Sequence, residues 1–155
     1  MILPLGDPRL YEVSLAVRQE EVDSLLPAIQ DLHDILFEFR TRYNAGRAIA
    51  APQIGVMKRL IYMNVGAPTV IINPTLTELS QEMFELWDDC MCFPNLLVRL
   101  KRHRSLRLVF RDAKWKEHTW ALNDSLSELI QHEYDHLNGI LATQRAIDSK
   151  SFKWR

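Results

Sequence analysis

Near the end of the chain, residues 125–139 read Ser125-Leu126-Ser127-Glu128-Leu129-Ile130-Gln131-His132-Glu133-Tyr134-Asp135-His136-Leu137-Asn138-Gly139. The apolar residues recur at the spacing of one helix face, and Gly139 stands where such a helix would end. Ser125 and Glu128 fit the S-x-x-E pattern, in which the two side chains bond backbone N–H groups at a helix N-terminus. We therefore expect a helix starting at Ser125, with Glu128 turned toward the backbone.

His132 and His136 are four residues apart on this helix. Their imidazoles are offset by about 40° around the axis and roughly 6 Å along it, so both can reach one metal ion. Glu133 beside them is the candidate general base. A catalytic metal usually takes three protein ligands, and no His, Cys or Glu follows His136. The third ligand is expected upstream, at Cys90 or Cys92, since a thiolate binds zinc and ferrous iron well.

Composition places the whole chain among ordinary globular proteins. It has 155 residues, 47% of them hydrophobic and 25% charged, which suits one domain spanning 1–155. The 19 Lys and Arg balance 20 Asp and Glu, so no net field draws the molecule to nucleic acid or a membrane. The two cysteines are too close in sequence to join distant segments, which favours a reducing compartment over a secreted disulfide scaffold. Without a signal-peptide pattern or a long apolar run, a cytoplasmic location is expected.

The remaining elements are predicted from periodicity. Apolar residues at spacings of three and four from Val22 to Phe39 indicate one long amphipathic helix, starting near Asp23 or Ser24 with Pro27 in its first turn. Six short β-like runs follow: 60–63, 69–72, 82–87, 96–100, 106–110 and 118–122. Helix, strands and helix without β-α alternation favour an α+β domain. We expect a mixed or antiparallel sheet packed around the histidine-bearing helix.

Three segments, in order and roughly in spacing, resemble the motifs of peptide deformylases. Gly46-Arg47-Ala48-Ile49-Ala50-Ala51-Pro52-Gln53-Ile54-Gly55 is similar to their G-x-G-x-A-A-P-Q-x-G motif. Asp88-Asp89-Cys90-Met91-Cys92-Phe93-Pro94 resembles E-G-C-L-S-x-P, and residues 132–136 match H-E-x-D-H. Flanking residues also match, so the resemblance covers nearly the whole chain.

The resemblance implies a metal site formed by Cys90, His132 and His136, with water as the fourth ligand. One divalent ion is expected. Ferrous iron is the metal that the family implies, and zinc or nickel also suits this ligand set.

The resemblance also implies the reaction, which is removal of the formyl group from N-terminal formylmethionine of new polypeptides, with release of formate. Metal-bound hydroxide would attack the formyl carbon, and Glu133 would act as general base and then as general acid toward the leaving amine. The Gln53 side-chain amide and the Met91 backbone N–H would stabilise the oxyanion.

Three departures from the family pattern make the chain a divergent member. Ala48 replaces a glycine, Asp88-Asp89 replaces Glu-Gly, and Cys92 replaces serine. Ala48 requires a negative φ or tolerated strain. Asp89 would make metal-bound water harder to deprotonate if it points inward, and would do little if it points outward. Cys92 offers an alternative thiol ligand.

The substrate pocket is expected to include Gly46, Ile49, Leu129 and Glu128. The last two lie three and four residues before His132, so they project near the metal. If Glu128 pointed inward, it would favour a polar or basic first side chain, because the family usually lines this side with apolar residues. We favour the capping role.

A run of six cations lies in residues 99–111: Arg99, Lys101, Arg102, Arg104, Arg107 and Arg111. The favoured interpretation is the solvated face of an edge strand, and the alternative is transient contact with ribosomal RNA. The expected partner is an N-formylmethionyl peptide, without a membrane or a sequence-specific nucleic acid.

Three alternatives to the deformylase remain. One is a homologue with altered or lost activity that keeps the metal and binds formylated N-termini. Another is a metal-stabilised module that recognises formyl groups without cleaving them. A zinc endopeptidase is disfavoured, because such enzymes commonly take their third ligand downstream.

Overall fold

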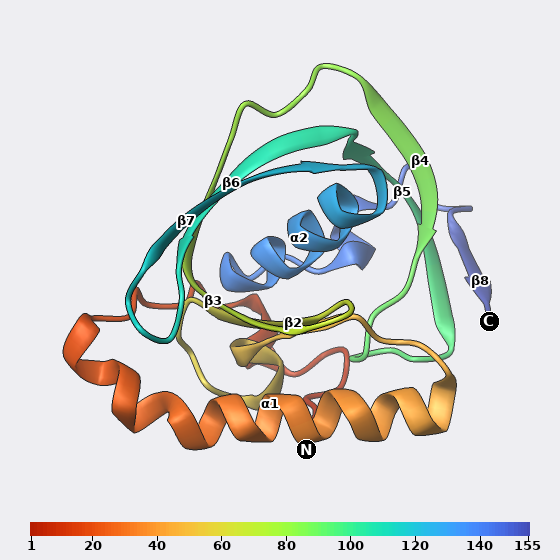
Figure 1. The fold of residues 1–155 in the computed structure, drawn as a ribbon. Coiled ribbons are helices and arrows are strands. Elements are labelled where there is room, and N and C mark those ends of the chain that lie inside the picture. The colour runs from red at the N-terminus through yellow and green to blue at the C-terminus, as the bar shows by residue number, and fades with distance from the viewer.

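The computed structural model describes residues 1–155, with helix α2 (Asp124–Leu137) at the centre of the molecule (Figure 1). Ten of its fourteen residues are buried, so the helix that carries both histidines is also the core helix. It starts at Asp124 rather than Ser125, and the predicted capping box is wrong. Glu128 does not cap the backbone. Its carboxylate pairs with the guanidinium of Arg47, because a charged donor binds it more strongly than a backbone N–H does.

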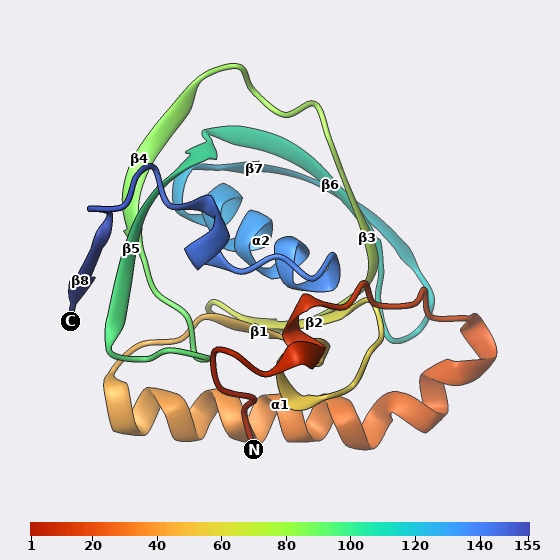
Figure 2. The ribbon, with the colours of Figure 1, turned by 180° about the vertical axis from the view of Figure 1, so that it is seen from behind.

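A five-stranded antiparallel sheet wraps around one side of α2 in the order β1-β2-β3-β6-β7. The strands are β1 (Ala48–Ala50), β2 (Leu60–Asn64), β3 (Pro68–Thr77), β6 (Ser105–Arg111) and β7 (Glu117–Asn123). Figure 2 shows the sheet curved around the helix. Alternation along the strands directs Ile61, Ile71 and Leu108 toward Ile130 of α2, in one buried cluster.

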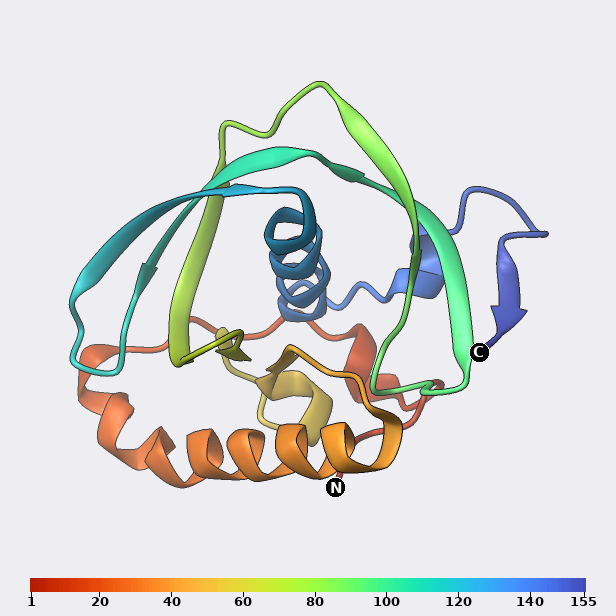
Figure 3. The same cartoon turned by 45° about the vertical axis from the view of Figure 1, so that its right-hand side comes forward.

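Helix α1 (Val22–Tyr43) lies against the opposite face of the sheet's β1-β2 end, away from α2 (Figure 3). Leu32, Leu36 and Phe39 pack there with Leu60 and Ile72. This part of the sheet is therefore covered on both faces, which explains why four of the five residues of β2 are buried.

The first turn of α1 differs from the prediction. A 3₁₀ turn at Gln19–Glu21 leads directly into the helix, and the Glu21 carboxylate accepts the Arg18 N–H at 2.8 Å. Pro27 is consequently the sixth helical residue instead of a first-turn residue. Its missing N–H removes one bond inside the helix.

A second antiparallel sheet has the order β4-β5-β8, formed by β4 (Met83–Asp88), β5 (Leu96–His103) and β8 (Phe152–Trp154). Val98 and Leu100 pack with Leu10, Cys90 and Leu141 in a third buried cluster. Strand β4 of this sheet ends at Asp88 and is followed directly by the segment that carries both cysteines.

The α+β prediction is confirmed, and all pairings between strands are antiparallel. The six predicted strands are present. Five of them extend beyond their predicted ends, and β4 is shifted by one residue. The three-residue strands β1 and β8 were not predicted. The edge-strand interpretation is wrong for residues 105–111, because β6 lies between β3 and β7. In β5, residues 100–103 pair with β4 alone, because the short strand β8 pairs only with Leu96–Val98. None of the helices combines the length and apolar character needed to cross a membrane.

Candidate active site

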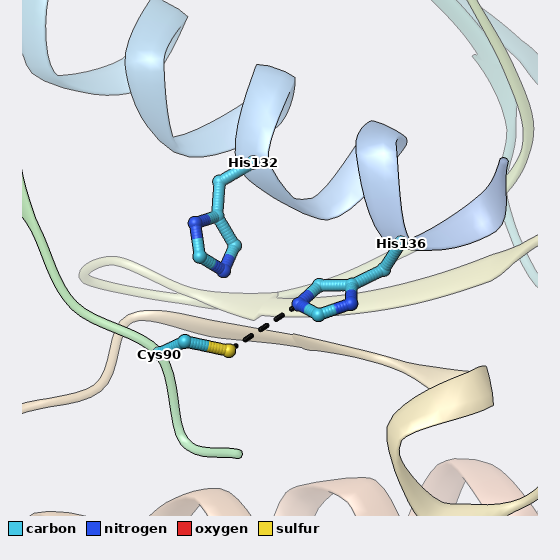
Figure 4. Close-up of side chains that lie close together, drawn as sticks. All are labelled: Cys90, His132 and His136. Carbon is cyan, nitrogen blue, oxygen red and sulfur yellow. Dashed lines mark hydrogen bonds between the residues drawn. The ribbon is translucent and has the colours of Figure 1, made fainter. Parts of the chain in front are cut away.

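Cys90, His132 and His136 converge beside α2 (Figure 4). The two histidines come from successive turns of the helix, and the cysteine comes from the segment after β4. One ligand atom from each residue lies within 4.8 Å of the other two, and all three residues are buried. Cys90 Sγ is 3.4 Å from His136 Nε2. The structure thus brings together the three residues that the sequence singled out.

Asp88, the last residue of β4, orients the first histidine. His132 Nδ1 donates to Asp88 Oδ2 at 2.8 Å, so the Nε2 atom is left for a ligand. Burial alone would lower the pKa of His132, but the charge and hydrogen bond of Asp88 raise it to about 9. Burial would raise the pKa of Asp88, but His132 and Arg102 lower it to about 2. This carboxylate-histidine pair was not predicted.

Arg102 extends the pair into a buried network. It contacts Asp88 at 3.3 Å and Asp135 at 2.6 Å, and Asp135 also accepts from Arg145 at 2.7 and 2.9 Å. Arg102 is only 2% exposed. The burial of Arg102 could have been found in the sequence from period-two alternation, since Val98, Leu100 and Arg102 share the buried face of β5.

The other four arginines of the basic run form ion pairs with exposed carboxylates. The pairs are Arg99 with Asp148 at 3.5 Å, Arg104 with Glu82 at 2.9 Å, Arg107 with Glu78 at 2.8 Å and Arg111 with Glu117 at 3.8 Å. The run therefore does not form an uncompensated basic face.

Gln53 lies in the 3₁₀ turn Ala51–Ile54 and is 1% exposed. Its Oε1 accepts the Ala50 N–H at 2.8 Å, which directs Nε2 toward Cys92 Sγ at 3.5 Å and Cys90 Sγ at 3.7 Å. Met91, also buried, has a backbone N–H that donates to no acceptor within the chain. Two donors are thus available beside the cysteine.

Glu133 is 3% exposed, and its Oε2 atom has no hydrogen-bond partner. Burial raises the pKa of its carboxyl to about 7. A carboxyl with this pKa can accept or donate a proton near neutral pH.

A pocket of about 310 Å³ opens beside these groups. Its lining includes Gln53, Cys90, Met91, Glu133 and His132, together with Phe39, Gly46, Arg47, Glu128 and Leu129. Ile49 does not line it. The side chain of Ile49 is fully buried and packs toward α1, because alternation along β1 turns it to the other face of the strand.

Gly46 and Arg47 shape the wall of the pocket opposite α2. Gly46 has φ +112°, and a Cβ atom there would lie 3.2 Å from Phe39 and 3.3 Å from Leu36, so the close approach of α1 favours glycine. Arg47 reaches α2, where Nη2 pairs with Glu128 Oε1 and Nη1 donates to the Ser125 carbonyl at 3.2 Å. Burial, partly offset by Arg47, raises the pKa of Glu128.

The three departures from the family pattern fit without backbone strain. Ala48 lies in β1 and Asp89 at the pocket rim, and neither has a positive φ. The Asp89 carboxylate is 39% exposed and pairs with Arg155, so its charge is compensated and screened. Cys92 is buried against Gln53 and is not part of the three-residue group.

The donor set fits a borderline-soft divalent cation. One sulfur and two imidazole nitrogens are the ligands that zinc and ferrous iron accept. Burial raises the pKa of the Cys90 thiol, so a cation would be needed to keep it as a thiolate at neutral pH. Burial lowers the pKa of His136, which favours the neutral imidazole that a metal requires. The pKa of His132 is raised, so a cation would have to displace the proton from its Nε2 atom on binding.

Comparison with known proteins agrees with this geometry. Residues 1–152 match the family model for polypeptide deformylase. The chain is 32% identical to peptide deformylase 1 of Prochlorococcus marinus, over 97% of this chain and 82% of that protein. It is 37% identical to a Wolbachia peptide deformylase, over 82% and 78% of the two chains.

Solved structures give the same result. The crystal structure of peptide deformylase from Thermotoga maritima is similar, with a TM-score of 0.86 and 27% identity, covering 96% of this chain and 97% of that one. A Plasmodium falciparum peptide deformylase in complex with an inhibitor has a TM-score of 0.85 and 28% identity, covering 96% and 90%. The chain belongs to the peptide deformylase family of hydrolases.

Proposed function

We propose that the protein removes the formyl group from the N-terminal formylmethionine of nascent polypeptides and releases formate. The observation that carries this proposal is the convergence of Cys90 with His132 and His136 beside a pocket that also contains Gln53 and Glu133. A cytoplasmic location suits such a substrate.

Cys90, His132 and His136 would hold one divalent cation, with ferrous iron as the first choice and zinc or nickel as alternatives. When bound, such a cation supplies a nucleophile by lowering the pKa of water to about 7 in favourable sites. Asp88 supports the ligand set, because its bond to His132 Nδ1 fixes the tautomer and the ring orientation.

Glu133 would take the proton of the attacking water and pass it to the nitrogen of the departing amine. Its unpartnered Oε2 is available for this transfer. Proton transfer of this kind is typically worth about 10² to 10⁴-fold in rate.

Gln53 Nε2 and the Met91 N–H would donate to the oxygen of the tetrahedral intermediate. The bond from Ala50 to Gln53 Oε1 fixes which end of the amide faces the site. Losing one such donor costs on the order of 10² to 10³-fold in rate.

Contact with the ribosome, if the enzyme acts during synthesis, would depend on few cations. Three basic residues of 99–111 and of the C-terminal residues 150–155 form no ion pair: Lys101, Lys150 and Lys153. The arginines of both stretches all pair with carboxylates.

The test is formate release from formyl-Met peptides by iron-loaded protein, with Glu133→Gln and Gln53→Leu beside it. We expect losses of about 10² to 10⁴-fold for the first variant and about 10² to 10³-fold for the second, with metal content retained in both. Full activity in Glu133→Gln would contradict the proton-transfer role. Failure of the loaded wild-type protein to release formate would favour a homologue that binds formylated N-termini without cleaving them.

A further inference from the structure

The pocket has a charged wall close to the reacting groups. Glu128 lies one helical turn before His132, roughly 6 Å along the axis, and Arg47 faces it from the start of the first motif segment. Cys90 and Gln53 line the same pocket as Arg47 and Glu128, so a formyl group bound beside the first two would leave the adjoining amino-acid side chain to contact this wall.

The two charges largely satisfy each other. Glu128 has 8% of its side chain exposed and Arg47 has 40%, and Arg47 is held further by the Ser125 carbonyl. A cationic substrate side chain would have to compete with Arg47 for the carboxylate, and an anionic one would compete with Glu128 for the guanidinium. The pair thus disfavours both charged classes.

Each partner nevertheless keeps one polar atom free. No hydrogen bond within the chain uses Arg47 Nε or Glu128 Oε2, and neither atom is sealed from solvent. One is a donor and the other an acceptor. A neutral side chain that carries an acceptor and a donor on one group could bond both.

We infer that Arg47 and Glu128 are specificity-determining residues that admit formylated peptides with a glutamine-like first side chain as well as methionine. This inference rests on the proposed deformylase function. Glutamine matches methionine in its unbranched reach, and its terminal amide offers an oxygen to Arg47 and an N–H to Glu128. A pocket with an apolar wall would instead penalise that amide, because it would be buried without partners.

The test compares kcat/KM for formyl-Gln-Ala-Ser and formyl-Met-Ala-Ser in wild type and in Arg47→Met/Glu128→Met. Hydrogen bonds to charged groups predict that the Gln/Met ratio falls about tenfold to a hundredfold in the double variant. The matched control is Arg107→Met/Glu78→Met, which removes an exposed ion pair that does not line the pocket and should leave the ratio unchanged.

The single variants supply a signature that a merely structural role would not produce. Arg47→Met leaves a carboxylate and should shift preference toward formyl-Lys peptides, whereas Glu128→Gln leaves a guanidinium and should shift it toward formyl-Glu peptides. Metal content is measured in every variant. Equal Gln/Met ratios in wild type and the double variant, with formate still released, would overturn the inference and leave the proposed function intact.

Peptide binding to the Glu133→Gln variant distinguishes failure of the inference from failure of the proposed function. If loaded wild type releases no formate, the proposed function falls, and calorimetry of both formyl peptides with Glu133→Gln then decides the recognition role. A difference in affinity between the formyl-Gln and formyl-Met peptides that disappears when Arg47→Met and Glu128→Met are added would uphold the inference. Absence of binding, or equal loss of both peptides, would overturn it.

Discussion

Two thiols lie at the site, but only Cys90 is grouped with the histidines. Cys92 Sγ is 3.5 Å from Gln53 Nε2, and its backbone N–H donates to Cys90 Sγ at 3.5 Å. The Cys92 side chain is therefore placed to buttress the amide, whereas Cys90 is placed to bind a cation.

This difference predicts opposite results for two conservative substitutions. Cys90→Ser should lose its bound metal during dialysis, because a hydroxyl is a much poorer ligand than a thiolate for zinc or ferrous iron. Cys92→Ser should retain a metal content near that of wild type. Elemental analysis of both purified variants checks this, and loss of metal from Cys92→Ser alone would reverse the assignment.

At the scale of elements, the end of α2 is fixed by contact with the N-terminal segment. Gly139 has φ +70°, and a Cβ atom there would lie 2.4 Å from the Tyr11 carbonyl oxygen. Gly66, in the β2–β3 turn, has φ +83° with nothing near its Cβ position.

Gly139→Ala should therefore destabilise the protein more than Gly66→Ala does. The second change carries only left-handed backbone strain, about 1 kcal/mol, while the first adds a backbone clash and should exceed about 2 kcal/mol. Urea unfolding of the two variants measures the difference, and equal losses would show that the Tyr11 segment yields freely.

The start of α1 depends on the ionised form of Glu21. The Arg18 N–H and Lys58 lower the pKa of this carboxyl from 4.5 to about 2. Because the folded protein binds this proton less readily than the unfolded chain, the contribution is complete above about pH 5 and is lost as the pH falls toward 2.

Glu21→Gln should consequently have a lower Tm than wild type at pH 7, with the gap closing as the pH falls toward 3. Thermal melts at both values test this. A gap that is constant with pH would mean that the carboxylate charge has no part in it.

For the whole molecule, Arg102 connects β5 to the end of β4 through Asp88, and to α2 through Asp135. Removing it would leave two buried carboxylates without their shared cation. Such losses typically cost about 3 to 5 kcal/mol.

Arg102→Leu should thus approach that range in urea unfolding, while Arg104→Leu, whose partners are exposed, should cost no more than about 1 kcal/mol. A small loss at Arg102 would indicate that the remaining partners, His132 for Asp88 and Arg145 for Asp135, are sufficient, or that the carboxylates become protonated.

The sequence was most informative where contacts are local. The spacing of His132 and His136 predicted their shared face, and alternation predicted six strands, because both depend only on backbone geometry. Partners distant in sequence were not predictable in this way. Glu128 matched a local capping pattern, yet its partner Arg47 is 81 residues away in sequence. Arg102 was interpreted as a surface cation, whereas it lies on the buried face of β5.

The central position of α2 has a consequence for the order of synthesis. The strands β1 to β7 leave the ribosome before the helix that fills the space between them, and Cys90 precedes His136 by 46 residues. Until α2 emerges, the inner faces that will hold Ile61, Ile71 and Leu108 have nothing to pack against. The strands are synthesised before the core helix that covers their inner faces, so an emerging chain exposes aggregation-prone strands until its last fifth is complete.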